Sequence, residues 1–177
     1  MAIQIAVASG KGGTGKTTVA SNLFHSINTY KTRGALLVDC DVEEPNAKLF
    51  FQESKILSRT TIYQEIPHID IPSCTFCRKC ADFCEFNAIV VIPPAGFAEI
   101  NPSLCHSCGA CLVACPSNAI HIQSEPIGTS TMYEDQNGNR LLEGRLKIGS
   151  AMQTMVIRTL KQSIPCLLYT SPSPRDL

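Results

Sequence analysis

Eight of the ten cysteines in this chain repeat one spacing twice. In each copy two residues separate the first three cysteines, and three residues separate the third from the fourth. The copies are Cys74, Cys77, Cys80 and Cys84, followed by Cys105, Cys108, Cys111 and Cys115. The offset of 31 residues continues beyond the cysteines, because Asn87-Ala88-Ile89 returns as Asn118-Ala119-Ile120. Such dense, repeated thiols indicate two related metal centres.

Disulfide bonds and zinc sites are two other possible uses of these cysteines. Disulfide bonds are disfavoured, because no export signal opens the chain and the runs are too tight for a spread of bridges. Ligation of metal in a reducing cytoplasm fits better. Zinc is the main remaining alternative, but zinc sites usually present paired ligands with a longer gap between the pairs. Two complete runs therefore favour iron–sulfur cubanes.

The cysteine runs resemble those of bacterial two-cluster [4Fe–4S] ferredoxins, in which the fourth cysteine of each run serves the other cluster. The resemblance assigns one cluster to Cys74, Cys77, Cys80 and Cys115. It assigns the other cluster to Cys105, Cys108, Cys111 and Cys84. Pro116 follows the second run as in that family, whereas Glu85 follows the first, which removes no ligand. Arg78 and Lys79 either offset cluster charge or are simply solvated.

A second motif, G-x-x-x-x-G-K-[ST], lies near the start of the chain and indicates a phosphate-binding loop. It follows an apolar stretch, residues 3–8, that predicts a strand, and it precedes a predicted helix. Glycines let successive N–H groups point at phosphate oxygens, and the helix dipole attracts the anion. Lys16 is expected to reach the β- and γ-phosphates, and the Thr17 hydroxyl to bind Mg²⁺. The predicted nucleotide-binding residues are Gly10, Lys11, Gly12, Gly13, Thr14, Gly15, Lys16, Thr17 and Thr18.

The second lysine of this loop, Lys11, resembles that of the deviant Walker A motif in the MinD/ParA/nitrogenase-iron-protein superfamily. The resemblance implies that Lys11 crosses to a partner's nucleotide in an ATP-sandwich homodimer. It also implies roles for the acids after the second strand, where that family carries its first switch. Asp39 would order the Mg²⁺ shell through water and Asp41 would orient the attacking water, so Lys11, Lys16 and Asp41 are the catalytic candidates. Either acid could instead cap a helix or turn, and Cys40 between them is expected to be a small buried residue.

Local patterns predict the elements that position these motifs. A helix is expected from Lys16 to about residue 30, with Val19, Leu23 and Ile27 on one face, and a buried parallel strand over residues 35–39. The stretch before the cysteines, to about residue 65, is expected to be loop. Residues 129–133 and 140–146 predict a hairpin around Asn137-Gly138. Ser150 is expected to cap a final helix that includes Met152, Met155, Val156 and Leu160.

These elements give an α/β fold: a P-loop NTPase with a parallel sheet, truncated, carrying an inserted α+β two-cluster ferredoxin domain. The expected boundaries are 1–65 for the first part of the ATPase domain, 66–125 for the proline-rich insert and 126–165 for its continuation. Residues 166–177 resemble a translated sequencing adapter, which leaves nine native cysteines. No second nucleotide switch was found. We therefore expect it beyond residue 165, and we expect residues 1–165 not to hydrolyse ATP efficiently alone.

Composition limits the partners. With 15 basic and 15 acidic residues the formal net charge is zero, which gives no pull toward nucleic acid or anionic membrane. No apolar run reaches the length of a membrane span, so a cytoplasmic protein is expected. The leading hypothesis is an ATP-binding iron–sulfur protein that couples nucleotide state to electron transfer, with ATP, Mg²⁺ and two [4Fe–4S] clusters and an unknown redox protein as partner. Two alternatives stay open, a cluster assembly or carrier ATPase and a positioning ATPase with structural clusters.

Overall fold

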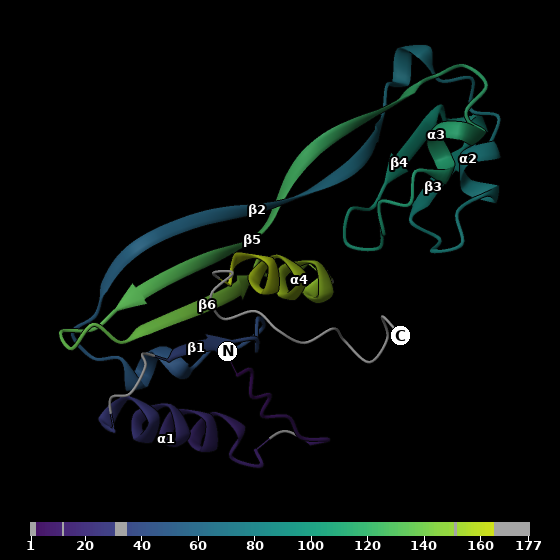
Figure 1. Ribbon diagram of the computed structural model, residues 1–177. Coiled ribbons are helices and arrows are strands. Elements are labelled where there is room, and N and C mark those ends of the chain that lie inside the picture. Colours follow the sequence, from purple (N-terminus) through teal and green to yellow (C-terminus); the bar gives the residue numbers. More distant parts are fainter. Residues whose placement is uncertain (1–2, 12, 31–34, 151, 165–177) are drawn as a thin grey trace. The chain divides into compact units, whose positions relative to one another are not determined.

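The computed structural model describes residues 3–11, 13–30, 35–150 and 152–164 (Figure 1). The chain divides into two compact units. The first, here the P-loop unit, comprises Met1–Thr60, Thr129–Arg145 and Thr154–Leu177. The second, here the cysteine unit, comprises Thr61–Gly128 and Leu146–Gln153 and contains all eight repeated cysteines. The predicted adapter segment lies outside the described residues.

The P-loop unit is a mixed α/β layer. Helix α1 (Lys16–Thr29) and strand β1 (Leu36–Asp39) follow the phosphate loop, and the short helix η1 (Ala47–Phe50) follows β1. Strand β1 pairs in parallel with β6 (Arg140–Leu146), so that Asp39 lies opposite Glu143. The sheet order is β1-β6-β5-β2, with β5 spanning Ile120–Glu134 and β2 spanning Lys55–Ile69. The predicted hairpin is confirmed as β5 and β6, and the predicted final helix as α4 (Gln153–Ser163).

Two contacts hold helices to the sheet of the P-loop unit. The Phe24 ring of α1 meets Phe51 with 5.4 Å between ring centroids, in a cluster with Ala47, Tyr133 and Leu141. On α4, Val156 and Leu160 are fully buried. A Cβ atom added at Gly144 of β6 would collide with the Leu160 side chain. Glycine at this position therefore lets α4 approach the strand closely.

Four features of the structure differ from what the sequence pattern indicates. Residues 3–8 form no strand, and Ile3 is 82% exposed, because no neighbouring strand among the described residues pairs with them. The face of α1 that carries Val19, Leu23 and Ile27 is exposed, since the helix packs through Ser21 and Phe24 instead. Residues 55–65, expected to be loop, belong to the long strand β2. The sheet is also mixed, with a parallel β1–β6 pair beside the β5–β6 hairpin.

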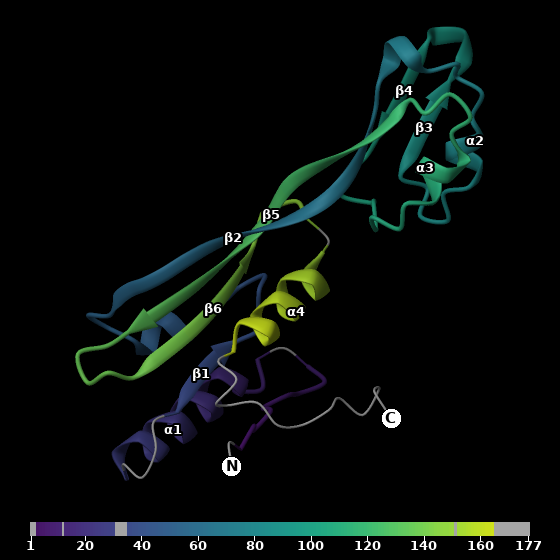
Figure 2. The same ribbon diagram turned by 45° about the horizontal axis from the view of Figure 1, so that its top comes forward.

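The cysteine unit contains a small antiparallel hairpin and two very short helices (Figure 2). The hairpin strands are β3 (Ile89–Ile92) and β4 (Phe97–Ile100), and the helices are α2 (Lys79–Asp82) and α3 (Ala110–Ala114). Single helical turns precede β3 and β4, namely η2 (Ile71–Ser73) and η3 (Pro93–Ala95). The core mixes aliphatic side chains with thiols, including Ile66, Ala88, Val91, Ile100, Cys80 and Cys111.

Candidate cluster and nucleotide sites

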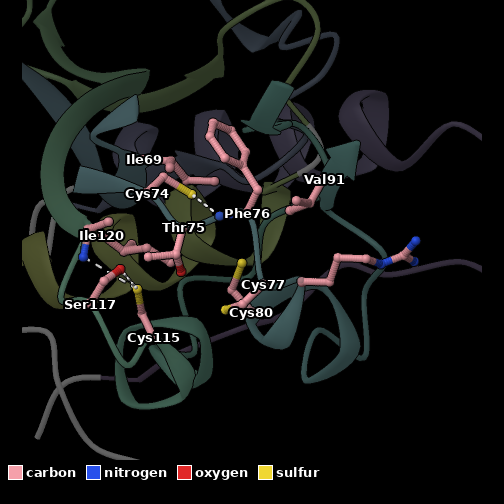
Figure 3. Close-up of a pocket in the computed structure, with 12 residues that line it drawn as sticks. Ile69, Cys74, Thr75, Phe76, Cys77, Cys80, Val91, Cys115, Ser117 and Ile120 are labelled. Atoms are coloured by element: carbon pink, nitrogen blue, oxygen red, sulfur yellow. Dashed lines mark hydrogen bonds between the residues drawn. The ribbon is translucent and has the colours of Figure 1, made fainter. Parts of the chain in front are cut away.

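The eight repeated cysteines line two separate cavities of the cysteine unit. Cavity 1 is lined by Cys74, Cys77, Cys80 and Cys115 (Figure 3). Cavity 2 is lined by Cys84, Cys105, Cys108 and Cys111. The unfilled space is about 310 Å³ in cavity 1 and about 330 Å³ in cavity 2, counting the part open to solvent. Each cavity thus takes three thiols from one run and the fourth from the other run.

A reciprocal pair of backbone hydrogen bonds explains this exchange of the fourth cysteine. The Asp70 N–H, before the first run, donates to the Ala119 carbonyl after the second run, with 2.7 Å between nitrogen and oxygen. The Asn101 N–H, before the second run, donates to the Ala88 carbonyl after the first run, also at 2.7 Å. The start of each copy is therefore fastened to the end of the other.

The sequence repeat is also a repeat of backbone conformation. Left-handed residues occur in pairs 31 residues apart, with φ of 52° at both Phe76 and Ser107. The same holds for Arg78 and Gly109, at 66° and 77°, and for Asn87 and Asn118, at 49° and 51°. Left-handed backbone is uncommon outside glycine and turns a chain sharply. Its recurrence shows that both copies wrap their cavities in the same way.

These turns aim backbone N–H groups at the sulfur atoms. The N–H groups of Phe76 and Ser107 donate to the thiols two residues earlier, Cys74 and Cys105, each with 3.4 Å between nitrogen and sulfur. The N–H groups of Ala88 and Ala119 donate to the thiols four residues earlier, Cys84 at 3.4 Å and Cys115 at 3.3 Å. Hydrogen bonds to a thiolate stabilise its negative charge. Both cavities therefore favour ligation by thiolate.

Burial works in the opposite direction at the innermost cysteines. Burial raises the pKa of Cys80, and it raises the pKa of Cys111 to about 11 with a further contribution from Cys105. The pKa of the exposed Cys77 is lowered by the Lys79 N–H and the Thr75 hydroxyl. Burial acts upward on the pKa of Cys115, but the Ser117 hydroxyl and nearby N–H groups bring it below the usual thiol range. A cationic metal centre must therefore displace protons from the buried thiols when it binds.

The spread of the sulfur atoms distinguishes a cluster from a single ion. Within the described residues, no three His, Cys, Asp or Glu side chains gather closely enough to hold one metal ion between them. A zinc ion collects its ligands tightly on one centre, whereas a cubane distributes four thiolates over different irons. Each cavity is lined by four thiols, the donor set that a [4Fe–4S] cluster uses.

One buried side chain that supports cavity 2 was missed from the sequence. Gln64 of β2 donates from Nε2 to the Cys105 carbonyl at 3.1 Å and to the Ser107 hydroxyl at 2.8 Å. Its exposed fraction is 2%, and it fastens the loop that begins the second run. The alternation of Ile62, Gln64 and Ile66 was the available signal, since these residues share one buried face of β2.

The phosphate loop of the P-loop unit lies directly before α1. Gly13 and Gly15 adopt left-handed φ values of 71° and 85°, which glycine accepts without steric cost. The Thr14 hydroxyl donates to the Ser9 hydroxyl at 2.7 Å and contacts the Lys11 carbonyl at 3.3 Å. The first turn of α1 has no side-chain cap, so its N–H groups can bind an anion. Gly12 lies outside the described residues.

The acids after β1 are placed differently from one another. Asp39 is buried, and its carboxylate accepts N–H groups from Asp41 at 3.1 Å, Asn46 at 3.1 Å and Ala47 at 2.9 Å. It therefore closes the loop that follows β1, and its role in the Mg²⁺ shell stays a prediction. Asp41 is exposed, and its role in orienting water stays a prediction. Cys40 is exposed too, contrary to expectation, because it lies beyond the last residue of β1.

A third acid at this edge, Glu143 of β6, was not singled out from the sequence. It lies opposite Asp39 in the parallel pair and is only 4% exposed. Its Oε1 accepts from Arg145 at 3.4 Å, while its buried Oε2 has no hydrogen-bond partner among the described residues. Burial raises the pKa of Glu143, Arg145 lowers it, and Asp39 raises it further. A glutamate directly after two leucines, at a position that β6 buries, was the signal.

Comparisons with known proteins agree with both motifs. The chain is 37% identical over 163 residues to the uncharacterized protein MJ0578 of Methanocaldococcus jannaschii, covering 90% of this chain and 54% of that protein. It is 49% identical over 49 residues to the uncharacterized ATP-binding protein MJ0547 of that organism, covering 28% of this chain and 18% of the relative. It is 43% identical over 47 residues to the ferredoxin-type protein NapF of Escherichia coli, covering 25% of this chain and 29% of NapF.

The length of these matches determines which statements about the family they support. The chain spans about half the length of the curated relatives that it matches over most of its own sequence. No helix among the described residues is long and apolar enough to cross a membrane. The family of CobQ/CobB/MinD/ParA nucleotide binding domains matches residues 5–168, nearly the whole sequence. The chain therefore belongs to the CobQ/CobB/MinD/ParA nucleotide-binding family, with a segment similar to ferredoxin-type proteins.

Proposed function

We propose that this chain is an ATP-binding iron–sulfur protein that holds one [4Fe–4S] cluster in each cavity and couples nucleotide state to electron transfer. The observation that carries this proposal is the partition of eight thiols into two sets of four with crossed fourth ligands. The similarity of one segment to ferredoxin-type proteins supports it independently. A bound cluster would accept or release one electron at a time.

The residues of this chain would divide the work between the two units. In the cysteine unit, thiolates would hold the clusters, and the repeated N–H groups would stabilise the charge on sulfur. In the P-loop unit, the first-turn N–H groups of α1 and Lys16 would hold the phosphates of ATP, with Thr17 and Asp39 serving Mg²⁺. Lys11 would reach the nucleotide of a second copy, which makes an ATP-dependent homodimer part of the proposal.

Pairs of cysteine substitutions test the cluster assignment. The chain, reconstituted anaerobically with iron and sulfide, is expected to hold two cubanes by iron and sulfide analysis and by electron paramagnetic resonance (EPR) after reduction. Cys84→Ser with Cys108→Ser damages only cavity 2, so one intact cluster is expected to remain. Cys84→Ser with Cys77→Ser changes one ligand in each cavity, so both clusters are expected to be impaired. The reverse pattern would reject the crossed assignment, and the absence of any cubane signal in the unaltered chain would reject the proposed function.

Coupling to the nucleotide needs a separate measurement. Light scattering with and without ATP and Mg²⁺ is expected to show a monomer that becomes a dimer, and Lys11→Ala is expected to prevent the change. The midpoint potentials of the clusters are expected to differ between the two nucleotide conditions. Transfer of iron and sulfide to an apo-acceptor without any ATP-dependent change in potential would instead support a cluster carrier.

A further inference from the structure

The two cavities share a backbone but differ in the side chains around it. Equivalent positions lie 31 residues apart, and the lining residues of cavity 1 other than Phe76 and Val91 have a counterpart that lines cavity 2. Arg78 lines cavity 1 where Gly109 lines cavity 2. Lys79, which acts electrostatically on Cys77, corresponds to Ala110. Two exposed cations thus stand beside cavity 1 where cavity 2 has none at the matching positions.

Two further lining positions differ in the same sense, whereas Phe76 of cavity 1 corresponds to Ser107 and differs in the opposite sense. Ser117 places its hydroxyl oxygen 3.6 Å from the Cys115 sulfur in cavity 1. Its counterpart in cavity 2 is Phe86, whose ring stacks on His106 with 3.9 Å between centroids and 15° between planes. The Thr75 hydroxyl bonds to Cys77, whereas His106 occupies the matching position in cavity 2. Cavity 1 is therefore lined by more hydrogen-bond donors, and cavity 2 by more aromatic and aliphatic surface.

Several contacts are the same in both cavities and therefore cannot make their clusters differ. Each cavity has two backbone N–H groups donated to sulfur at 3.3–3.4 Å. The third cysteine of each run, Cys80 or Cys111, is buried to nearly the same degree, with 8% and 7% exposed. The fourth ligand differs again, because Cys84 of cavity 2 precedes the carboxylate of Glu85 and Cys115 of cavity 1 precedes Pro116. The first cysteine is buried in the second run, at Cys105, and only partly buried in the first, at Cys74, so the cavities differ in this burial and in the side chains around them.

Reduction of a cluster adds one negative charge to its cavity. Nearby cations and hydrogen-bond donors stabilise that charge, whereas apolar surroundings and a neighbouring carboxylate destabilise it. We infer that the cluster in cavity 1 has the higher reduction potential, so that the first electron supplied by a one-electron reductant resides there while the cluster in cavity 2 stays oxidised. This inference rests on the proposed function, because it requires both clusters.

An EPR-monitored redox titration of the full chain, loaded with both clusters, tests the inference. Dithionite serves as reductant, and the pH is kept alkaline so that imidazoles are neutral. Two separated one-electron waves are expected. Arg78→Gly with Lys79→Ala installs the residues that the other copy carries, and it is expected to move the higher midpoint down toward the lower one. The matched control Ala110→Lys adds a cation beside cavity 2 and is expected to move the lower midpoint up.

The outcomes separate this inference from the function on which it rests. Coincident waves in the unaltered chain, or a shift of the lower wave by the Arg78 and Lys79 substitutions, would overturn the inference while leaving the two-cluster assignment standing. A chain without the iron content of two cubanes would overturn the proposed function as well. Retention of the cubane EPR signal in each variant shows that a shifted midpoint does not come from a lost cluster.

Discussion

The cysteine unit and the P-loop unit build their sites in different ways. In the cysteine unit every thiol of both cavities lies within the unit, and the two copies of the repeat fasten each other through backbone hydrogen bonds. In the P-loop unit the site is a glycine loop at one helix end, beside an exposed apolar face of α1. A site made from repeated backbone turns therefore draws its ligands from its own segment. A phosphate loop depends in addition on the sheet that supports it.

Removal of iron is expected to have the largest effect on this difference between the two units. If the free concentration of cluster is a thousandfold above its Kd, loss of the clusters lowers the free energy of unfolding by about 4 kcal/mol. Hydrogen exchange is expected to accelerate strongly at the Asp70 and Asn101 amides, which hold the two copies together. The Val19 amide of α1, which donates to Gly15 at 2.9 Å, is the control and is expected to keep its rate. Equal acceleration in both units would show that the P-loop unit depends on the clusters as well.

Truncation of Phe24 tests how the P-loop unit is stabilised. Phe24 is 9% exposed and packs on Phe51, so Phe24→Ala is expected to cost about 3–5 kcal/mol in the P-loop unit. Val19→Ala on the exposed face of the same helix is the matched control, with an expected change within about 0.5 kcal/mol. Denaturant unfolding followed by hydrogen exchange measures both. A larger effect at Val19 than at Phe24 would mean that the exposed face is covered in solution.

Substitution of Lys16 tests the phosphate loop without disturbing the clusters. Hydrogen bonds to charged groups contribute about 1.5–3 kcal/mol, so Lys16→Ala is expected to weaken ATP binding by about tenfold to more than a hundredfold. Isothermal titration calorimetry with ATP and Mg²⁺ measures the change. The cubane EPR signal is expected to be unaltered, because Lys16 belongs to the other unit. Unchanged ATP affinity would contradict the assignment of the loop.

The smallest expected effect is a pH dependence caused by Glu143. Because its folded pKa is raised, the folded state holds the proton at pH values where the unfolded state has released it. Stability is therefore expected to fall as pH rises from the ordinary glutamate range through the raised pKa, and then to level off. Glu143→Gln removes this titration and should flatten the profile of unfolding free energy in metal-free buffer. A slope that persists in the variant would show that Glu143 is not its cause.

The sequence predicted the cysteine site better than its surroundings. Ligand spacing is local, and the repeated Asn-Ala-Ile coincides with left-handed residues at Asn87 and Asn118. The crossed grouping of the thiols came from the resemblance to two-cluster ferredoxins, and the lining of the two cavities agrees with it. Periodicity placed Val19, Leu23 and Ile27 on one face of α1 but did not single out Phe24, because its packing on Phe51 joins distant residues that periodicity within one helix cannot reveal. Strand β2 was missed for a related reason, since its alternation includes a polar Gln64 that is buried only because it supports the second run.

The reciprocal bonds between the copies have a consequence for how such a segment can change. The carbonyl that receives the Asp70 amide belongs to the second copy, and the carbonyl that receives the Asn101 amide belongs to the first. Each copy also provides one ligand to the cavity of the other. Deleting either copy would remove a ligand and a strand-end contact from the survivor. A chain that kept only one run is therefore expected to hold three thiols in its remaining cavity and to need a new fourth ligand there.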